Sequence, residues 1–546
     1  MNAIEAQLIE SISQAIDALY HIETQSGMVM VEIPKDKTKG DYSTNIAMRL
    51  KKVLNMNPQE IANGLVGELS KSDIIASVEV AGPGFINFWM KKDVLANVID
   101  TILEQGNDFG KNNAGKGEKV LVEYVSANPT GILHLGHARG AAWGDSLTRI
   151  MKASGFDVCR EYYVNDAGAQ IDNLGKSVFA RYLESYGKPF TLPEDGYHGE
   201  DVKAIALKIR DEVGDKYVNC SEEEVLDFFK AEGKRLEMQR IEKDLDYFRV
   251  GFDSWISELS IYQQGRVEKV METMAEKGLT YEKDDAIWFR STDFGDDKDR
   301  VLKKSNGLYT YLTPDIANHV YKLERGYSKL VNLWGADHHG YIPRMKAALQ
   351  ALGYAPDCLE VDIIQMVRLV ENGMEVKMSK RTGNALTIRE LCEDIGVDAT
   401  RYFFVSRALD THLDFDLGLA RSQTSDNPVY YAQYAHARIC SIIAACNYEK
   451  ATTYDLLVHD KEVQLLKYLN EFSNVVADCA LTRSPNKMCT YIQRCASLFH
   501  TFYNECKVND PSNPQLSSQR VALCQACEIV LKNALYYIGV SAPEKM

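Results

Sequence analysis

A short apolar run in the first third of the chain is followed by a turn and then by a helical pattern. Leu121, Val122, Tyr124 and Val125 form a β-prone segment, as in a parallel strand that is buried on both faces. Turn-forming residues at 128–131 end this segment. The apolar positions that follow recur at helical spacing and comprise Ala138, Ala141, Ala142, Leu147 and Ile150. The pattern predicts a buried strand, a tight loop and a helix.

Strands and helices continue to alternate through the central region. The β-prone segments are 286–290, 307–315 (which runs into a helix), 329–335 and 362–369. Such alternation favours an α/β fold with a doubly wound (Rossmann-like) parallel sheet, which we place within residues 109–405. A charged, helical stretch from 200 to 248 is interpreted as insertion material, and the whole insertion is set at about 155–250.

The regions on either side of this centre have different patterns. Residues 1–108 predict a separate α+β module. Its helical segments are 3–20, 45–54 and one beginning at 57, and its β-prone runs are 28–33, 76–80 and 85–90. Beyond about residue 405 the periodicity is helical throughout, so residues 406–546 are predicted to form an all-α domain.

Size and charge limit the class of protein. The 546 residues exceed the roughly 250–300 that one hydrophobic core usually serves, so several domains are expected. The net charge of −15 argues against nucleic-acid binding driven by bulk charge. It leaves room for an RNA whose shape meets local basic patches.

The cysteines and the N-terminal segment indicate the compartment. Cys524 and Cys527 form a C-x-x-C without a second pair at zinc-like spacing, so we interpret them as buried free thiols. The N-terminal segment has the pattern of an acidic amphipathic helix rather than a signal peptide, and no apolar run is long enough to span a bilayer. We therefore expect a cytoplasmic protein with no membrane partner.

Two histidines stand where the predicted strand passes into the helix. His134, Gly136 and His137 lie at the N-terminus of that helix, where free N–H groups and the helix dipole attract phosphate. The imidazoles can donate hydrogen bonds to phosphate oxygens, and Gly136 permits a close approach to the backbone. Two histidines three apart could also supply half of a zinc site, although no H-E-x-x-H pattern is present. We interpret the element as a nucleotide phosphate site and expect no protein-bound metal.

A basic loop follows the predicted strand at 362–369. It reads E-V-K-M-S-K-R-T-G over residues 375–383. A basic loop by itself is usually only a solvated surface. Together with the histidine element, its lysines can close over a leaving pyrophosphate and neutralise the charge that develops in the transition state.

Two further segments carry residues suited to RNA. Tyr430, Tyr434 and Arg438 lie on or near one face of a predicted helix, where they either pack at a domain junction or offer stacking surfaces for unpaired bases. Asn45 follows a lysine-rich loop in the N-terminal module, which is either solvated or in contact with phosphates and bases.

The histidine and lysine elements occur together in a known family. A-N-P-T-G-I-L-H-L-G-H over 127–137 and K-M-S-K over 377–380 resemble the paired signatures of class I aminoacyl-tRNA synthetases. Over essentially its whole length, the chain resembles arginyl-tRNA synthetases of the bacterial type. The segments that carry this resemblance are V-E-Y-V-S-A-N-P-T-G, Y-T-Y-L-T-P-D, G-A-D-H-H-G-Y-I-P-R, D-N-P-V-Y-Y-A-Q-Y-A-H-A-R and G-D-Y-S-T-N-I-A. Many members of the family have a degenerate second signature, whereas here it is complete.

The resemblance implies an arginine–tRNA ligase that works in two steps. The carboxylate of L-arginine attacks the α-phosphorus of ATP, and the terminal ribose hydroxyl of tRNA(Arg) then attacks the arginyl adenylate. The implied catalytic residues are His134, His137, Lys377 and Lys380. The implied ATP contacts are His134, Gly136, His137, Met378, Ser379 and Lys380, with Mg²⁺ bridging phosphate oxygens. The implied arginine contacts are Glu123, Ser126, Asn128, Tyr311 and Asp315.

The resemblance also implies how tRNA is held. The helical C-terminal domain would read the anticodon and the N-terminal module the tRNA corner, with contacts from Asn45, Tyr430, Tyr434 and Arg438. The first step is expected to need bound tRNA, and the enzyme is expected to be a monomer. No editing domain is expected, because a long charged side chain with a bidentate anchor is discriminated well without one.

Three other functions are weighed against this one: a smaller-substrate adenylyl transfer enzyme, a class I synthetase for another amino acid, and a non-catalytic RNA-binding paralogue. An adenylyl transfer enzyme would not need the helical C-terminal region. The acidic and tyrosine-rich residues expected around the substrate argue against a different, apolar amino acid, and the two complete signatures argue against a non-catalytic paralogue. The role of His338 and His339 stays open between a substrate or adenine contact and a structural one.

Overall fold

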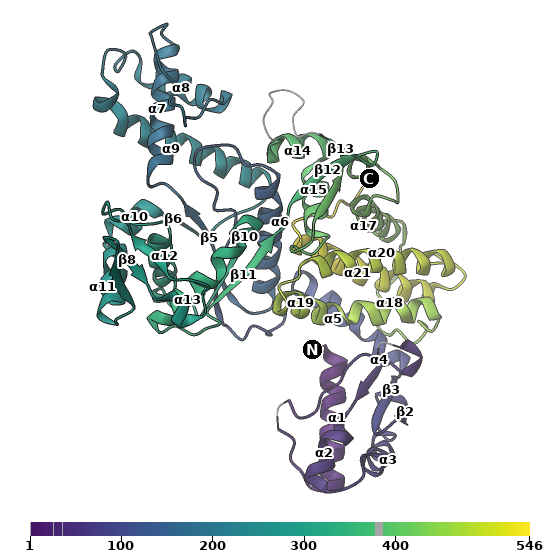
Figure 1. Ribbon diagram of the computed structural model, residues 1–546. Coiled ribbons are helices and arrows are strands. Elements are labelled where there is room, and N and C mark those ends of the chain that lie inside the picture. Colours follow the sequence, from purple (N-terminus) through teal and green to yellow (C-terminus); the bar gives the residue numbers. More distant parts are fainter. Residues whose placement is uncertain (1, 26, 35, 377–385) are drawn as a thin grey trace.

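A five-stranded parallel sheet lies at the centre of the computed structural model, which describes residues 2–25, 27–34, 36–376 and 386–546 (Figure 1). Its strands are β4 (Lys119–Glu123), β5 (Asp157–Val164), β6 (Ser254–Ser257), β10 (Lys329–Gly335) and β11 (Leu359–Ile364). The spatial order is β11–β10–β4–β5–β6, and every neighbouring pair is parallel. The order therefore reverses between β4 and β10, and ligands of such sheets bind outside the carboxyl ends of the strands at this reversal.

Strand β4 is buried on both faces. Val120, Val122 and Tyr124 enter one hydrophobic cluster, whereas Leu121 enters another on the opposite side. Helix α6 (Leu135–Ala153) covers the first face, and a Cβ atom at Gly144 would lie only 2.4 Å from the Tyr124 ring. This close packing fixes the N-terminus of α6 beside the carboxyl end of β4.

The other face of the sheet is covered by helices and a small antiparallel sheet. The helices are α10 (Glu258–Gln263), α11 (Arg266–Glu276), α12 (Leu312–Glu324) and α13 (Ile342–Leu352), with short 3₁₀ turns η3 (Ser291–Phe294) and η4 (Ala336–Tyr341). The antiparallel strands are β7 (Thr280–Lys283), β8 (Ala286–Phe289) and β9 (Arg300–Lys303). The apolar residues of these helices and strands share one hydrophobic cluster, which holds α12 against this face of the central sheet.

Three helices project away from the sheet (Figure 1). They are α7 (Ala169–Glu184), α8 (Glu200–Val213) and α9 (Glu222–Tyr247), and they pack around a cluster of their own. The insertion expected at about 155–250 includes β5, which belongs to the central sheet. The projecting helices are confined to 169–247.

The N-terminal module has a separate core around an antiparallel sheet of order β1–β3–β2. Its elements are α1 (Ala3–Tyr20), η1 (Lys37–Lys39), β1 (Tyr42–Thr44), α2 (Ile46–Leu54), α3 (Pro58–Leu69), β2 (Ile75–Ala81) and β3 (Phe85–Met90). The linking elements are α4 (Lys92–Ala96), α5 (Val98–Gln105) and η2 (Gly106–Asp108). Lys467 of the C-terminal region forms an ion pair with Asp41 of this module, so the N-terminal module and the C-terminal region are in contact.

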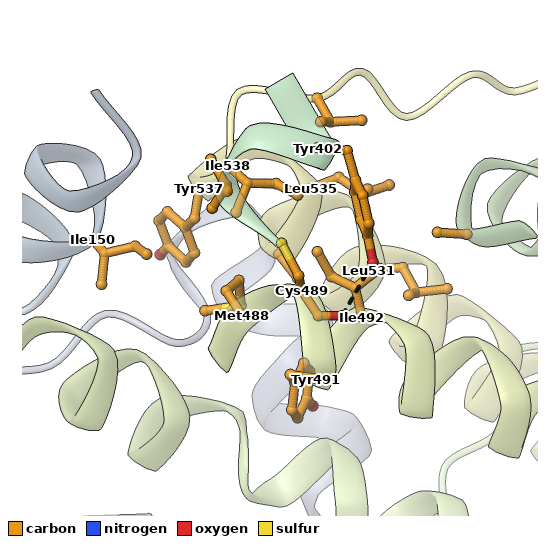
Figure 2. Packing of buried hydrophobic residues seen from close by; sticks show 14 of the residues in the cluster. Ile150, Tyr402, Met488, Cys489, Tyr491, Ile492, Leu531, Leu535, Tyr537 and Ile538 are labelled. Carbon is orange, nitrogen blue, oxygen red and sulfur yellow. Dashed lines mark hydrogen bonds between the residues drawn. The ribbon is translucent and has the colours of Figure 1, made fainter. Parts of the chain in front are cut away.

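The C-terminal part is a helical bundle preceded by a small sheet. Its elements are β12 (Val367–Glu371), β13 (Met374–Glu375), α14 (Ile388–Ile395), α15 (Val397–Val405), β14 (Leu413–Asp416), α16 (Leu417–Arg421), α17 (Pro428–Ala445), α18 (Asp460–Asn470), α19 (Phe472–Leu481), α20 (Asn486–Glu505) and α21 (Pro514–Tyr537). Figure 2 shows Tyr402, Cys489 and Leu531 packed in the core of this bundle, and Ile150 of α6 beside Tyr537. The bundle and the central sheet thus share one continuous hydrophobic cluster.

The structure shows the state of the cysteines and the character of the helices. All twelve cysteines are free, and Cys524 and Cys527 are buried, which confirms their interpretation as buried thiols. Within the described residues we find no helix that combines the length and the apolar character needed to cross a membrane.

Several predicted strands differ from the observed ones. Residues 28–33 contribute only an isolated bridge, Glu32 with Ser43, and residues 307–315 contribute a bridge at Tyr309 before α12 begins at Leu312. The single strand predicted at 362–369 is two strands, β11 and β12, in different sheets. Strand β14 interrupts the region predicted to be wholly helical. These short segments have apolar runs that periodicity alone does not assign to strand, turn or helix start.

Candidate active site

The loop between β4 and α6 holds two histidines in a fixed arrangement. His134 caps α6, and its Nδ1 accepts a hydrogen bond from the Gly136 N–H at 3.2 Å. The Nδ1 of His137 accepts from the His134 N–H, also at 3.2 Å. The two rings are stacked, with centroids 3.8 Å apart. Each Nδ1 is therefore occupied as an acceptor.

This arrangement determines the protonation of both rings. Burial lowers the pKa of His134, and burial together with the neighbouring His134 lowers the pKa of His137 to about 3. Both rings are neutral at pH 7, and because Nδ1 accepts, the proton of each ring resides on Nε2. The two Nε2–H groups and the free N–H groups of the first turn of α6 form a donor set suited to phosphate oxygens.

The turn that leaves β4 has an unusual backbone. Val125 and Ser126 have positive φ angles of 69° and 40°, which cost about 1–3 kcal/mol each in non-glycine residues. The Ser126 Oγ donates to Glu123 Oε1 and accepts from the Tyr163 N–H, both at 3.1 Å. These bonds hold the turn in place at the point where the strand order reverses.

Glu123 has a cationic partner inside the protein. The ammonium group of the buried Lys322 bonds to Glu123, and it lies 3.8 Å from Glu161, which also pairs with Arg325. Burial raises the pKa of Glu123, but the charges of Lys322 and His319 and the bonds from Lys322 and Ser126 hold it below the ordinary value. The expected contact between Glu123 and arginine stays a prediction, and sequence reasoning missed Lys322, which lies in the helix after Asp315.

Asp315 lies in the first turn of α12 rather than at the end of a strand. Its Oδ2 accepts a hydrogen bond from the Tyr341 hydroxyl at 2.7 Å. Burial raises the pKa of Asp315 to about 7; the charge of Glu123 adds to this, while the Tyr341 bond and Lys322 oppose it. Tyr311, which precedes α12, is 80% exposed. A half-buried carboxyl with such a pKa is a good acceptor for a cationic substrate.

Two residues near Asp315 were not predicted from the sequence. Glu258, the first residue of α10, is 8% exposed, and its pKa is raised to about 7 by burial and by the charges of Asp315 and Asp166. The buried Tyr163 hydroxyl on β5 has no hydrogen-bond partner in the described part of the chain. Burial and the charges of Asp315 and Glu258 raise the pKa of Tyr163. We call Tyr163, Glu258, Asp315 and Tyr341 the acidic site.

A sequence signal for these two residues did exist. Tyr163 lies near the carboxyl end of β5, and Glu258 directly follows β6. Both strand ends lie on the edge of the sheet where ligands are expected. The partners could not be named from the sequence because β6 is short and its pairing with β5 is non-local.

The remaining predicted contacts lie around this edge. Asn128 is exposed, and its Nδ2 donates to Gln170 Oε1 of α7 at 2.8 Å. His338 and His339 are exposed in η4, directly after β10. Their place at the carboxyl edge is compatible with both roles left open for them.

The chain that follows the basic loop lies beside the histidine element. Lys377, Met378, Ser379 and Lys380 lie outside the described residues. Thr387, just after that segment, forms a bridge with His134, and the Ile388 N–H donates to the Leu133 carbonyl at 3.0 Å. The described chain thus resumes directly beside the predicted phosphate site.

The predicted RNA contacts on α17 form an aromatic surface. Tyr430 and Tyr434 are stacked, with centroids 6.2 Å apart and an interplanar angle of 10°, and Tyr434 stacks on His500 of α20. The Arg438 guanidinium lies 4.5 Å from the Tyr503 ring centroid. We call these five residues the aromatic face. In the N-terminal module, Asn45 precedes α2, and its buried Oδ1 has no hydrogen-bond partner among the described residues.

Comparisons with known families match almost the whole chain. The model of the class I (R) tRNA synthetase catalytic domain matches residues 98–403. The models of the arginyl-tRNA synthetase N-terminal domain and the DALR anticodon-binding domain match residues 6–90 and 432–546. The chain belongs to the arginyl-tRNA synthetase family. Two sequence relatives are the arginine–tRNA ligases of Geobacillus kaustophilus and Bacillus subtilis, which are 56% and 54% identical. Those alignments cover 95% and 96% of this chain and 94% and 95% of the relatives.

A solved arginyl-tRNA synthetase from Thermus thermophilus has the same fold. Its TM-score is 0.75 at 22% identity, with full coverage of both chains. The predictions of the arginyl-tRNA synthetase family, the doubly wound fold with two flanking parts and the activity as an arginine–tRNA ligase are confirmed. As a class I synthetase, the protein uses ATP.

Proposed function

We propose that this arginyl-tRNA synthetase forms arginyl adenylate from L-arginine and ATP at the carboxyl ends of β4 and β10 and then transfers arginine to the 3′ end of tRNA(Arg). The observation that carries this proposal is that a phosphate donor set and an acidic site lie at the same, carboxyl edge of the sheet. The donor set consists of His134, His137 and the N-terminus of α6. The acidic site offers carboxyls whose raised pKa values are lowered again when a cation binds.

The first step requires positioning and charge neutralisation rather than proton transfer. The Nε2–H groups of His134 and His137 would donate to the phosphate oxygens of ATP as negative charge shifts toward pyrophosphate. Lys377 and Lys380, with Met378 and Ser379, would bind the departing pyrophosphate from the loop whose far end is joined to His134 through Thr387. Gly136 allows the nucleotide to approach the backbone.

The arginine side chain would enter the acidic site. A guanidinium has five N–H donors and keeps its charge at all accessible pH values. Asp315 is the principal acceptor, and Ser126, Asn128 and Tyr311 remain the proposed contacts around the rest of the amino acid. Glu123 supports the site through Lys322, and its own contact with arginine is a proposal from the family pattern.

Mg²⁺ would reach the site with the phosphates of ATP. The residues described at the phosphate site are imidazoles and N–H groups, which suit phosphate oxygens rather than Mg²⁺. Elsewhere in the described chain, His436, Cys440 and Glu528 form a group of possible metal ligands. There Nδ1 of His436 lies 2.9 Å from the Pro543 carbonyl and Nε2 lies 3.2 Å from Glu528 Oε1, so both ring nitrogens already have partners within the protein.

The tRNA would span the two flanking parts of the molecule. The aromatic face on α17 and α20 offers stacked rings and a guanidinium, which suit unpaired bases of the anticodon loop. Asn45, which precedes α2 in the N-terminal module, is the proposed contact with the tRNA corner. The proposed domains are residues 1–108, 109–405 and 406–546. We further propose that the first step requires bound tRNA and that the enzyme is a monomer located in the cytoplasm.

Pyrophosphate exchange over all amino acids, with and without total tRNA, tests the proposal. We expect exchange with arginine only, and only when tRNA is present. Exchange with another amino acid would contradict the proposal that the acidic site binds arginine. Tight tRNA binding without aminoacylation would identify a non-catalytic protein.

A further inference from the structure

We propose that Arg389 is a positioning residue for adenylate formation: it holds the start of α14 against the end of α9 and thereby fixes the chain segment that is paired with His134. The inference rests on the role of His134 under the proposed function. Arg389 is the second residue of α14 and acts through the residues just before it.

The start of α14 is bonded to the loop that carries His134. Thr387, the N-cap of α14, forms an antiparallel bridge with His134, and the Ile388 N–H donates to the Leu133 carbonyl at 3.0 Å. Thr387 is also tied to its own helix, because its N–H donates to Glu390 Oε2 and its Oγ1 accepts from the Glu390 N–H, both at 3.0 Å. A shift of α14 would therefore move the backbone of His134.

Arg389 connects this helix start to the last turn of α9. Its Nε donates to Asp244 Oδ1 at 2.7 Å, and its Nη2 donates to the Lys243 carbonyl at 3.4 Å. The guanidinium also lies 4.6 Å from the centroid of the Tyr247 ring. The helix dipole favours a cation at this end of α9. One side chain thus makes three contacts with a single helical turn.

Helix α9 is itself held in place at both ends. Ile241 and Leu245 near its C-terminus are buried in the hydrophobic cluster that includes α6, and Leu391 of α14 joins the same cluster. Val225 and Phe229 near its N-terminus are buried in the cluster of the projecting helices. Because buried side chains pack densely, α9 has little freedom to follow a movement of α14.

This pairing affects position more than stability. The side chain of Arg389 is 39% exposed and that of Asp244 is 12% exposed, and ion pairs near the surface contribute little to the free energy of unfolding. A reaction rate is far more sensitive to geometry, because a misplacement of about 1 Å can cost roughly 100-fold. Loss of Arg389 should therefore change the rate of adenylate formation much more than the melting temperature.

The deciding experiment measures single-turnover formation of arginyl adenylate, with tRNA(Arg) present, in wild type, Arg389→Gln and Arg421→Gln. Arg421 is the matched control, because its Nε donates to Asp394 Oδ1 at 3.0 Å near the other end of α14 and its side chain is 35% exposed. We expect Arg389→Gln to lower the rate by roughly 10- to 100-fold and to leave the KM for arginine within about twofold. Arg421→Gln should keep the wild-type rate within about twofold.

A double substitution tests whether Arg389 acts through His134. In a His134→Ala background the donor that Arg389 positions is gone, so Arg389→Gln should lower the rate by no more than about threefold further. If the two losses multiply in full, Arg389 acts by another route and the proposal is refuted. Asp244→Asn breaks the same pair from α9 and should reproduce the loss. It replaces Arg389→Gln in every comparison if that variant fails to fold.

The outcomes distinguish this proposal from the proposed function. If neither wild type nor Arg421→Gln forms arginyl adenylate, the proposed function fails, and this inference fails with it. If both do, and Arg389→Gln keeps the wild-type rate within about twofold, only the positioning role is refuted. Equal losses in Arg389→Gln and Arg421→Gln would also refute it, because they would reflect a general loosening of α14.

Discussion

At the scale of single residues, the site works through groups whose charge differs from the ordinary one. His134 and His137 are neutral because burial lowers their pKa values, and each ring carries its proton on Nε2 because its Nδ1 accepts a backbone hydrogen bond. Burial raises the pKa values of Asp315 and Glu258; the charge of Glu123 adds to the rise at Asp315, and the charges of Asp315 and Asp166 add to the rise at Glu258. On the proposed assignment of these residues, bound substrates would relieve this unfavourable electrostatic energy.

The first prediction concerns the phosphate site. His134→Ala removes one Nε2–H donor that we assign to the developing charge of pyrophosphate. We expect the rate of adenylate formation to fall by about 100-fold, with little change in the KM for arginine. Single-turnover pyrophosphate release measures this. His412→Ala, at an exposed position, serves as control, and an unchanged rate in His134→Ala would remove this residue from the mechanism.

The second prediction concerns pH. The Asp315 carboxyl is protonated below its pKa of about 7, and a protonated carboxyl cannot pair with a guanidinium. The KM for arginine should therefore rise as the pH falls, by roughly tenfold for each pH unit below 7, while the KM for ATP stays nearly constant. Asp315→Asn should have a high KM and a flatter profile. A wild-type KM for arginine that is independent of pH between 6 and 8 would contradict the assignment.

The linked effect on stability has the opposite sign. Because the pKa of Asp315 is raised in the folded state, the native protein binds more protons than the unfolded chain between pH 4 and 7. Raising the pH through this window therefore removes stability from the protein without substrate. Saturating arginine should return part of it.

At the scale of elements, α6 is the part that positions the chemistry. Its first turn carries the histidines, and its middle lies against β4 through Gly144 and Tyr124. A strand buried on both faces and a helix in close contact leave little freedom for the loop between them. The strained Val125 and Ser126 lie in that loop, held by hydrogen bonds to neighbouring strands.

The third prediction tests this packing. Gly144→Ala places a Cβ 2.4 Å from the Tyr124 ring, so α6 or the ring must shift. We expect a loss of about 1–3 kcal/mol in the free energy of unfolding, measured with denaturant. Gly67→Ala in α3 meets nothing within 4 Å and should be neutral or slightly stabilising. Equal effects of the two changes would show that α6 does not need the close contact.

At the scale of the whole molecule, the flanking parts are joined to the catalytic sheet in different ways. The N-terminal module is built around a separate cluster, to which the bundle contributes Val463 of α18, whereas the C-terminal bundle shares a hydrophobic cluster with α6. The fully buried Arg401 pairs with Asp145 of α6 and donates to the Ile538 carbonyl after α21. A tRNA bound to the aromatic face would therefore contact a bundle that packs directly against the helix of the proposed active site.

The fourth prediction concerns that face. Tyr430→Ala and Tyr434→Ala each remove a stacking surface, which is worth about 1–3 kcal/mol for a bound base. We expect the KM for tRNA to rise by about tenfold or more, with the KM values for arginine and ATP unchanged in the exchange reaction at saturating tRNA. Tyr536→Ala, at another exposed tyrosine of the same bundle, should have no such effect. A change in the KM for arginine alone would contradict a role in RNA binding.

Local patterns in the sequence were sufficient to predict several elements of the fold. The strand, loop and helix at 119–153 follow from apolar periodicity and turn residues that lie close together in the chain, and the phosphate site follows from where that helix begins. The division into a parallel sheet and flanking parts follows from how strands and helices alternate. The strands predicted at 307–315 and 362–369 were wrong, because short apolar runs fit a strand and a helix start equally well.

Tertiary structure alone decided which charges meet. Lys322 pairs with Glu123 across about 200 residues of sequence, and Glu258, Asp315 and Tyr163 converge from three different elements. No local pattern records such contacts, because they depend on the order of strands in the sheet and on the helices that cover it. The protonation of these groups depends in turn on burial and on neighbouring charges, which exist only once the chain has folded.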